Sequence, residues 1–128
     1  MWNGAPADTC TNNLNWGCER TGYPANILNP IKSARVRTVK SFAFRYGILE
    51  TRVKLPAGDW LWPAVWLMPK VNAYSQWPSS GEIDLLEGRG NRDLYNEADR
   101  HMGTNHVAST MHFGPAWNLN GYEFANFG

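Results

Sequence analysis

The sequence predicts an all-β protein built as an antiparallel β-sandwich. Three segments between Ala34 and Leu55 alternate apolar with polar residues and are rich in β-branched and aromatic side chains, a pattern typical of half-buried strands. Gly47 and Pro56 interrupt the pattern, and no segment of the chain has the periodicity of a long helix. Short strands separated by turn residues favour a sandwich over a helical or α/β fold.

Two apolar strands and several loops are expected outside that region. The dense apolar run 61–69 follows a turn at 57–59, and residues 107–113 form another short strand-like segment. Pro63 cannot donate a ladder hydrogen bond, so the first of these strands should lie near a sheet edge or carry a bulge there. Segments rich in Gly, Asn, Pro or other polar residues are expected to be loops: 1–33, 70–80, 88–105 and 114–128.

The strands are too few for a complete sandwich. Only about five or six are visible, whereas sandwich domains often run to about 200–250 residues. We therefore expect residues 1–128 to be one partial domain. Such a chain should expose sheet edges and an unpaired apolar face.

The composition argues against several classes of partner. The chain has 12 Lys and Arg residues against 11 Asp and Glu residues, so charge gives no reason to expect nucleic acid or an anionic membrane. No apolar run approaches about 18 residues, and the first ten residues lack the basic start and apolar stretch of a signal peptide. Seven Trp residues indicate either an aromatic core or a surface for flat, partly apolar ligands.

The two cysteines, Cys10 and Cys18, lie close together in a loop-like segment. Without a nearby pair of histidines they make a poor zinc site. A disulfide that closes a small loop is the favoured interpretation, with two free thiols as the alternative, and it would place the protein in an oxidising, extracellular compartment. His101, His106 and His112 do not have metal-ligand spacing, so no metal site is predicted.

The segment "SSGEIDLLEGRGN" crowds three acids, Glu82, Asp84 and Glu87, into six positions before two glycines. Ser79 and Glu82 form a possible capping box, so a short helix is one interpretation. In a strand, Glu82 and Asp84 share one face, and Glu87 joins them only if a β-bulge near 85–86 accommodates one extra residue. The local sequence leaves helix and strand equally open, and either could simply present a solvated acidic surface.

If the three acids share a face, their spacing suits cleavage of a glycosidic bond. Retaining glycosidases use two carboxyl groups about 5–5.5 Å apart that flank one bond. Strand residues four positions apart have Cα atoms about 13 Å apart, and two glutamate side chains leaning together can close most of that gap. Three neighbouring carboxylates cannot all ionise easily, so one of their pKa values should be raised, as a general acid requires.

Two tryptophans in the apolar run, Trp62 and Trp66, lie on one face if that run is a strand. Such a pair could form the floor of a cleft that binds sugar rings, whose C–H faces are apolar and whose hydroxyls are polar. Burial of both indoles in a hydrophobic core is the alternative.

Together these motifs resemble glycoside hydrolase family sixteen, in its laminarinase branch. The resemblance is carried by "GEIDLLEGRGN", "LWPAVWLMP", "WPSSGEID" and "TMHFGP", while "CTNNLNWGCERTG" and "SARVRTVKSFAFRYG" resemble the branch's invertebrate members. It implies a β-jelly roll of two curved antiparallel sheets with a cleft on the concave face. The resemblance covers nearly the whole chain, but the family's first strands, its later half and its usual structural calcium site are missing.

Carried over by position, the resemblance implies that Glu82 is the nucleophile, Glu87 the general acid/base and Asp84 a carboxylate that assists the nucleophile. Four further residues match positions that line or support the cleft: Trp62, Trp66, Trp77 and His112. The implied activity is retaining endo-hydrolysis of β-1,3-glucan without a cofactor, by a secreted protein that is monomeric when complete. The alternative is a non-catalytic receptor of innate immunity that binds β-1,3-glucan or lipopolysaccharide, and the presence of both glutamates favours the enzyme.

Overall fold

The computed structural model describes residues 2–3, 19–28 and 33–128, and the chain divides into two compact units, 1–35 and 36–128. In the first unit, β1 (Trp2–Asn3) pairs antiparallel with β2 (Glu19–Arg20). The sequence predicts loop for residues 1–33. In the described part of this range, the two short strands β1 and β2 depart from that prediction. The predicted Cys10–Cys18 disulfide lies outside the described residues.

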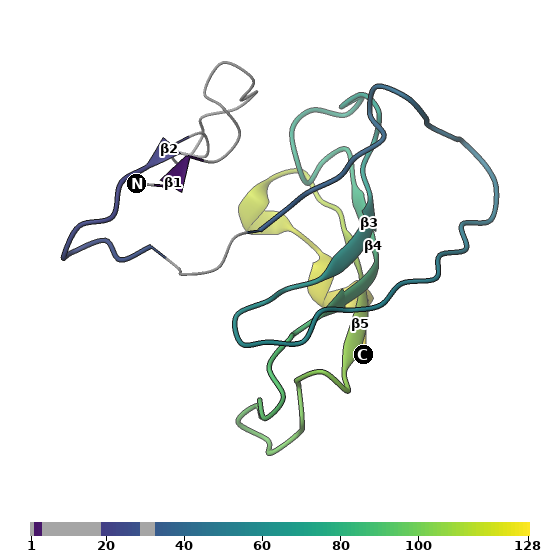
Figure 1. The fold of residues 1–128 in the computed structure, drawn as a ribbon. Helices are drawn as coiled ribbons and strands as arrows, with labels where there is room; N and C mark the ends of the chain where they lie inside the picture. The colour runs from purple at the N-terminus through teal and green to yellow at the C-terminus, as the bar shows by residue number, and fades with distance from the viewer. Residues whose placement is uncertain (1, 4–18, 29–32) are drawn as a thin grey trace. The chain divides into compact units, whose positions relative to one another are not determined.

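The second unit is built on one four-stranded antiparallel sheet. Its strands lie in the order β3 (Ala64–Leu67), β4 (Glu82–Gly88), β5 (Val107–His112) and β6 (Asn126–Phe127). Figure 1 shows β3, β4 and β5 side by side. The acidic segment is thus a strand and not a helix. Pro63 immediately precedes β3. In the part of the chain that the structure describes, β3 is an edge strand of this sheet, as the missing N–H of Pro63 predicts.

One extra residue makes β4 bulge against both of its neighbours. Against β3, Leu85 has no partner in the register, because Leu86 and Asp84 pair with consecutive residues of β3. Against β5, Asp84 and Glu87 pair with residues only two positions apart. The Ser109 hydroxyl donates a hydrogen bond of 2.9 Å to the Leu85 carbonyl oxygen and so occupies a backbone acceptor at the bulge. The predicted bulge is confirmed.

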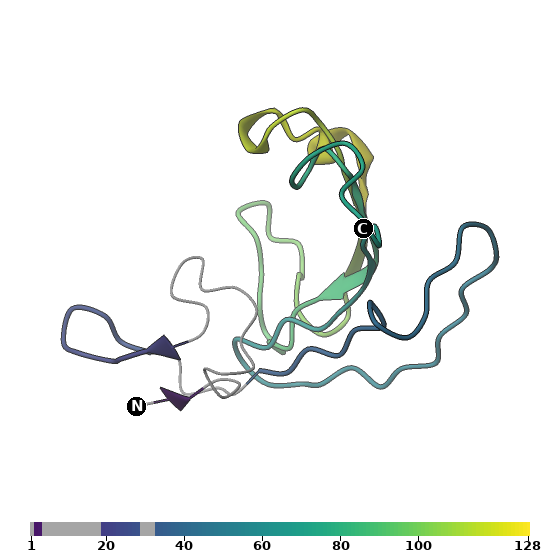
Figure 2. The ribbon, with the colours of Figure 1, turned by 90° about the horizontal axis from the view of Figure 1, so that it is seen from above.

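Residues 34–56 depart most from the sequence prediction. They form no strand in the structure, so the strands expected at 34–40, 41–47 and 48–55 are wrong here. Figures 1 and 2 show most of this segment as a long extended excursion from the sheet, and Val36 and Ile48 are 97% and 96% exposed. Alternation does not suffice for a strand, because a strand also needs a neighbour for its backbone groups and a face on which to pack.

The face of the sheet opposite the acids is open. Ile83 and Met111 are cross-strand partners on that face and remain 42% and 45% exposed. Within the described ranges, no apolar side chain other than Pro78 is fully buried. The all-β, antiparallel fold class is confirmed, and the described residues supply one layer of the expected sandwich, with its apolar face uncovered.

Two short 3₁₀ helices follow β5 in a region that the sequence predicts to be loop. They are η2 (Trp117–Leu119) and η3 (Tyr122–Ala125), and Asn120 ends the first of them. The backbone N–H of Gly121 donates to the Phe113 carbonyl oxygen at 2.7 Å, which folds this segment back toward the end of β5. Single turns of this kind leave no hydrophobic periodicity in the sequence, so a composition-based reading misses them.

The loop before β3 is tied to the loop after β4 by backbone contacts. Gly58 N–H donates to the Gly90 carbonyl oxygen, and Gly90 N–H donates to the Leu61 carbonyl oxygen, each at 2.8 Å. A Cβ at Gly90 would collide with the Gly58 carbonyl oxygen, so only glycine allows this approach. The contact holds Trp62, the next residue after Leu61, beside the end of β4.

Candidate active site

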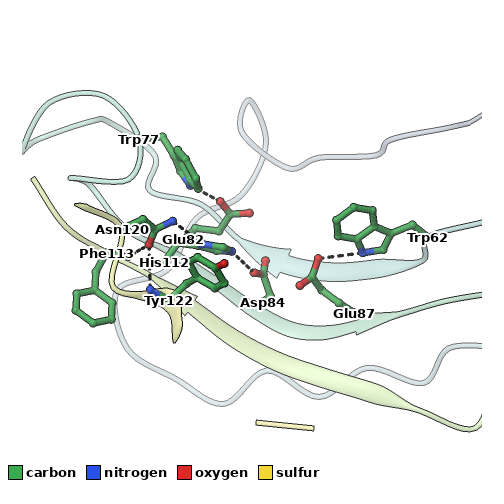
Figure 3. A network of polar contacts seen from close by, with 9 residues as sticks. All are labelled: Trp62, Trp77, Glu82, Asp84, Glu87, His112, Phe113, Asn120 and Tyr122. Atoms are coloured by element: carbon green, nitrogen blue, oxygen red, sulfur yellow. Dashed lines mark hydrogen bonds and ion pairs between the residues drawn. The ribbon is translucent and has the colours of Figure 1, made fainter. Parts of the chain in front are cut away.

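The three acids of β4 project from one face of the sheet. Figure 3 shows Glu82, Asp84 and Glu87 in a row along that face. Their cross-strand partners in β5 are His112, Thr110 and Ala108, which alternate along that strand and therefore share the face. Without the bulge, Glu87 would point to the opposite side. The sequence-predicted catalytic residues are thus brought together.

The carboxylate of Glu82 is held by a tryptophan from the loop before β4. Trp77 Nε1–H donates to Glu82 Oε2 at 2.5 Å, in a part-buried contact. The Trp77 ring also lies 5.4 Å from the His112 ring, centroid to centroid. Because the indole is packed on one side and hydrogen-bonded at its edge, it fixes the direction of the Glu82 carboxylate.

A second tryptophan holds Glu87. Trp62 Nε1–H donates to Glu87 Oε1 at 3.0 Å, although Trp62 lies before β3 and not within it. The Arg89 guanidinium lies over the Trp62 ring with its Cζ 4.1 Å from the ring centroid. An Arg89 N–H also donates to the Gly88 carbonyl oxygen at 3.0 Å, which holds that guanidinium close to the strand end.

Asp84 is the most deeply buried of the three acids, with 3% of its surface exposed. Its Oδ2 lies 3.1 Å from His112 Nε2, at ion-pair distance, although that oxygen has no hydrogen bond of good geometry. Burial raises the pKa of Asp84 above its ordinary value, the charge of Glu82 adds to this rise, and His112 opposes it. The expectation is a raised pKa on the general acid, caused by the neighbouring charges; the structure shows a raised pKa on Asp84, and burial is its larger cause.

Trp66 pairs with Asp84 across β3 and β4, which places it on the face of the acids. The Trp62 indole also reaches that face through Glu87, and Trp62 is 61% exposed whereas Trp66 is half-buried. Both tryptophans therefore reach the face of the acids, and their role in binding sugar rings stays a prediction. The alternative of a buried core pair does not hold.

The network contains two residues that the sequence prediction missed. Asn120 Nδ2 lies 2.9 Å from His112 Nδ1, and the Tyr122 ring lies 5.6 Å from the His112 ring. Both come from the segment around η2 and η3, as Figure 3 shows. Their context, "NLNGYEF", has no motif of its own, and only the folding back of this segment onto β5 brings it to the site.

A separate polar pocket of about 440 Å³ lies where the Gly58 and Gly90 loops meet. Its lining residues are Ala57, Gly58, Asp59, Asn91, Arg92 and Asp93. None of the three acids of β4 is among them. Within the described ranges, no group of three His, Cys, Asp or Glu side chains is placed to hold a metal ion.

The sheet presents two glutamates on one face with a buried aspartate between them, and a pair of carboxyl groups is what glycoside hydrolases use to cleave their substrates. The family model described as the XgeA-like, catalytic GH16 domain matches residues 11–120 of the chain. The chain belongs to this family, which confirms the resemblance to glycoside hydrolase family sixteen.

Several characterised proteins are similar to this chain. A "Beta-1,3-glucan-binding protein" of Penaeus monodon is 52% identical over 116 residues, which cover 91% of this chain and 30% of that protein. The "Glucan endo-1,3-beta-glucosidase A1" of Niallia circulans is 40% identical over 69% of this chain and 11% of its own length. The "Glucan endo-1,3-beta-glucosidase" of Cryptopygus antarcticus is 40% identical over 70% of this chain and 29% of its own length.

The chain therefore spans less than a third of the length of each of these relatives. No solved structure matches it. Among the residues that the structure describes, none belongs to a helix with the length and apolar character needed to cross a membrane.

Proposed function

We propose that the protein is a retaining endo-β-1,3-glucanase in which Glu82 and Glu87 carry the chemistry. The observation that supports this most directly is that each glutamate lies on the same sheet face and accepts a hydrogen bond from an indole N–H, at 2.5 and 3.0 Å. Two carboxyl groups oriented on one face are what a double displacement at an anomeric carbon requires.

In the first step, Glu82 attacks the anomeric carbon and the bond from that carbon to the leaving oxygen breaks. The Trp77 indole N–H holds one Glu82 oxygen, so the other is free to form the bond to carbon. Glu87 donates its proton to the leaving oxygen. Since Glu87 Oε1 accepts from Trp62, its proton is carried on Oε2.

In the second step, Glu87 removes a proton from water, and the resulting hydroxide equivalent attacks the anomeric carbon. The bond between that carbon and Glu82 breaks, and the sugar leaves with its original configuration. Asp84 lies beside Glu82 with a raised pKa, so it can keep a proton and share it with the Glu82 carboxylate as that carboxylate gains and loses charge.

The proposed substrate class rests on the relatives and on the tryptophans. One relative is described as a β-1,3-glucan-binding protein and two as glucan endo-1,3-β-glucosidases. The descriptions of all three therefore refer to β-1,3-glucan. The exposed Trp62 beside Glu87 offers an aromatic surface for the apolar face of a glucose ring. We propose an extracellular location for the protein, which the disulfide expected between Cys10 and Cys18 would favour.

The second candidate function is glucan recognition without hydrolysis, as in a receptor of innate immunity. The 52% identity to a protein named for glucan binding favours it. The intact acid row favours the enzyme, because binding alone does not require two oriented glutamates and a buried aspartate.

The test uses the full-length protein with laminarin, a soluble β-1,3-glucan, and its variants Glu82→Gln and Glu87→Gln. We expect the parent to release reducing ends whose first-formed anomer, seen by proton NMR, is β. Each variant should lose hydrolysis by about 10³-fold or more while its laminarin dissociation constant changes little, because glutamine keeps the size of glutamate. A folded parent that binds laminarin and releases no sugar would establish the receptor instead.

A further inference from the structure

Asn120 is anchored by the backbone at the junction of η2 and η3. Its Oδ1 accepts the N–H of Phe113 at 3.3 Å and the N–H of Tyr122 at 3.2 Å. These two donors determine which end of the amide is the oxygen, because the opposite assignment would set an NH₂ group against two N–H groups. The amide orientation of Asn120 therefore follows from its neighbours, as the dashed contacts in Figure 3 show.

The fixed amide determines the protonation of one ring nitrogen of His112. Asn120 Nδ2 lies 2.9 Å from His112 Nδ1, and an amide nitrogen can only donate. His112 Nδ1 must then accept, so the neutral ring carries its hydrogen on Nε2. The rings of Trp77 and Tyr122 lie 5.4 and 5.6 Å from the His112 ring and limit its rotation.

The protonated nitrogen faces the buried aspartate. His112 Nε2 is 3.1 Å from Asp84 Oδ2, an oxygen that is shielded from solvent. Nε2 and Oδ2 face each other at this distance without a hydrogen bond of good geometry, and because a donor lies beside Oδ2, a proton on Asp84 is placed on Oδ1. Glu82 lies two positions before Asp84 on the same face of the sheet, and its charge adds to the raised pKa of Asp84, so Glu82 is the carboxylate with which that proton can be shared.

We propose that Asn120 is a positioning residue that sets the His112 tautomer and thereby the oxygen of Asp84 that holds the proton. In the opposite tautomer, the lone pair of His112 Nε2 would face Oδ2 and draw the Asp84 proton away from Glu82. The consequence for turnover rests on the proposed hydrolytic function. The tautomer itself does not.

The informative variant is Asn120→Asp in the full-length protein. Aspartate has nearly the same shape and can still accept from the N–H groups of Phe113 and Tyr122, so the turn keeps its hydrogen bonds. A carboxylate cannot donate to His112 Nδ1, so that nitrogen must take up a hydrogen of its own. Asn118→Asp, at an exposed position two residues away, is the matched control for the added charge.

The first readout is nitrogen-15 NMR of the His112 ring at neutral pH. We expect a bare Nδ1 and a protonated Nε2 in the parent and in Asn118→Asp, and a protonated Nδ1 with a bare Nε2 in Asn120→Asp. A ring protonated on both nitrogens in Asn120→Asp would show that Asn120 does not set the position of the Nε2 hydrogen and would overturn the proposal. A protonated Nδ1 in the parent would overturn the proposal without any variant. The titratable groups that face this ring are Asp84 and Glu82 of β4 and Tyr122 of η3, so the pH is held constant throughout.

The second readout is laminarin hydrolysis. We expect Asn120→Asp to lower kcat by about tenfold with KM unchanged, because binding contacts are retained and only the proton position changes. A purely structural role would leave kcat unaltered when the turn is intact, and that result together with the altered tautomer overturns the proposal. If the parent hydrolyses nothing, the proposed function fails, and the NMR result alone then supports or overturns the tautomer assignment.

Discussion

The indole of Trp62 donates a hydrogen bond of 3.0 Å to Glu87, across 25 positions of the sequence. The same indole is covered on its ring by the guanidinium of Arg89, at 4.1 Å. One oxygen of Glu87 is therefore occupied, and one face of the indole is unavailable to a sugar. Trp62 thus joins two roles, the orientation of a carboxyl group and the presentation of a single aromatic face.

We expect Trp62→Phe to separate these roles. Phenylalanine keeps an aromatic face and lacks the indole N–H, so Glu87 loses a donor to a charged group, a contact usually worth about 1.5–3 kcal/mol. On laminarin, kcat should fall by about tenfold or more while the dissociation constant changes by less than about threefold. Trp60→Phe, at a residue that is 78% exposed, is the control. An unchanged kcat in Trp62→Phe would show that the hydrogen bond does not orient the acid.

The roles of the two glutamates are separable by azide, a small anionic nucleophile that needs no base. In Glu87→Ala, an aryl glucoside with an activated leaving group should still form the glycosyl-enzyme, and azide should release a β-glycosyl azide. In Glu82→Ala, azide should replace the missing nucleophile and give the α-glycosyl azide. The anomeric configuration of each product, read by NMR, checks the assignment, and exchanged configurations would reverse it.

The acid row could be predicted from sequence because its constraint is local. A strand has a side-chain period of two, so Glu87 can share a face with Glu82 and Asp84 only through one extra residue, and the structure has that residue at Leu85. The family resemblance predicts Trp62 and Trp77 in the cleft, but their donation to Glu87 and Glu82 depends on loop geometry that the sequence does not specify.

Two features of the structure were not predicted from the sequence: the lack of strands in residues 34–56 and the position of Asn120. Both depend on non-local contacts. Residues 34–56 have the alternation of strands, yet a strand is stable only beside another strand, and in the described part of the chain no strand forms a β-ladder with this segment. Asn120 reaches His112 because a 3₁₀ turn folds back onto β5. No periodic pattern in residues 114–128 predicts that turn.

The bulge makes a specific prediction about deletions in β4. Removing Leu85, which is 38% exposed, should restore a regular strand and keep all three acids on one face. Removing Ile83 should move Glu82 to the opposite face. We expect the Leu85 deletion to retain measurable laminarin hydrolysis, reduced by about 10²-fold through misplacement, and the Ile83 deletion to retain none. Equal inactivity of two proteins with similar melting temperatures would contradict this.

The raised pKa of Asp84 predicts how stability depends on pH. Burial and the charge of Glu82 favour the protonated form in the folded state, so between pH 3.8 and the raised pKa the folded protein binds more protons than the unfolded chain. Stability from this group is therefore fully present below pH 3.8 and is lost as pH rises through the raised pKa. Asp84→Asn cannot ionise and escapes that loss.

We expect Asp84→Asn to raise the melting temperature relative to the parent at neutral pH, and this difference to shrink below pH 3.8, where Asp84 is neutral in both states. Asp93→Asn, at an exposed position, controls for the loss of one carboxylate. Melting temperatures of the three proteins from pH 3 to pH 8, measured by calorimetry, decide the matter. A destabilising effect of Asp84→Asn at neutral pH that shrank toward low pH would mean that the fold favours the ionised form, held by His112 across the 3.1 Å contact.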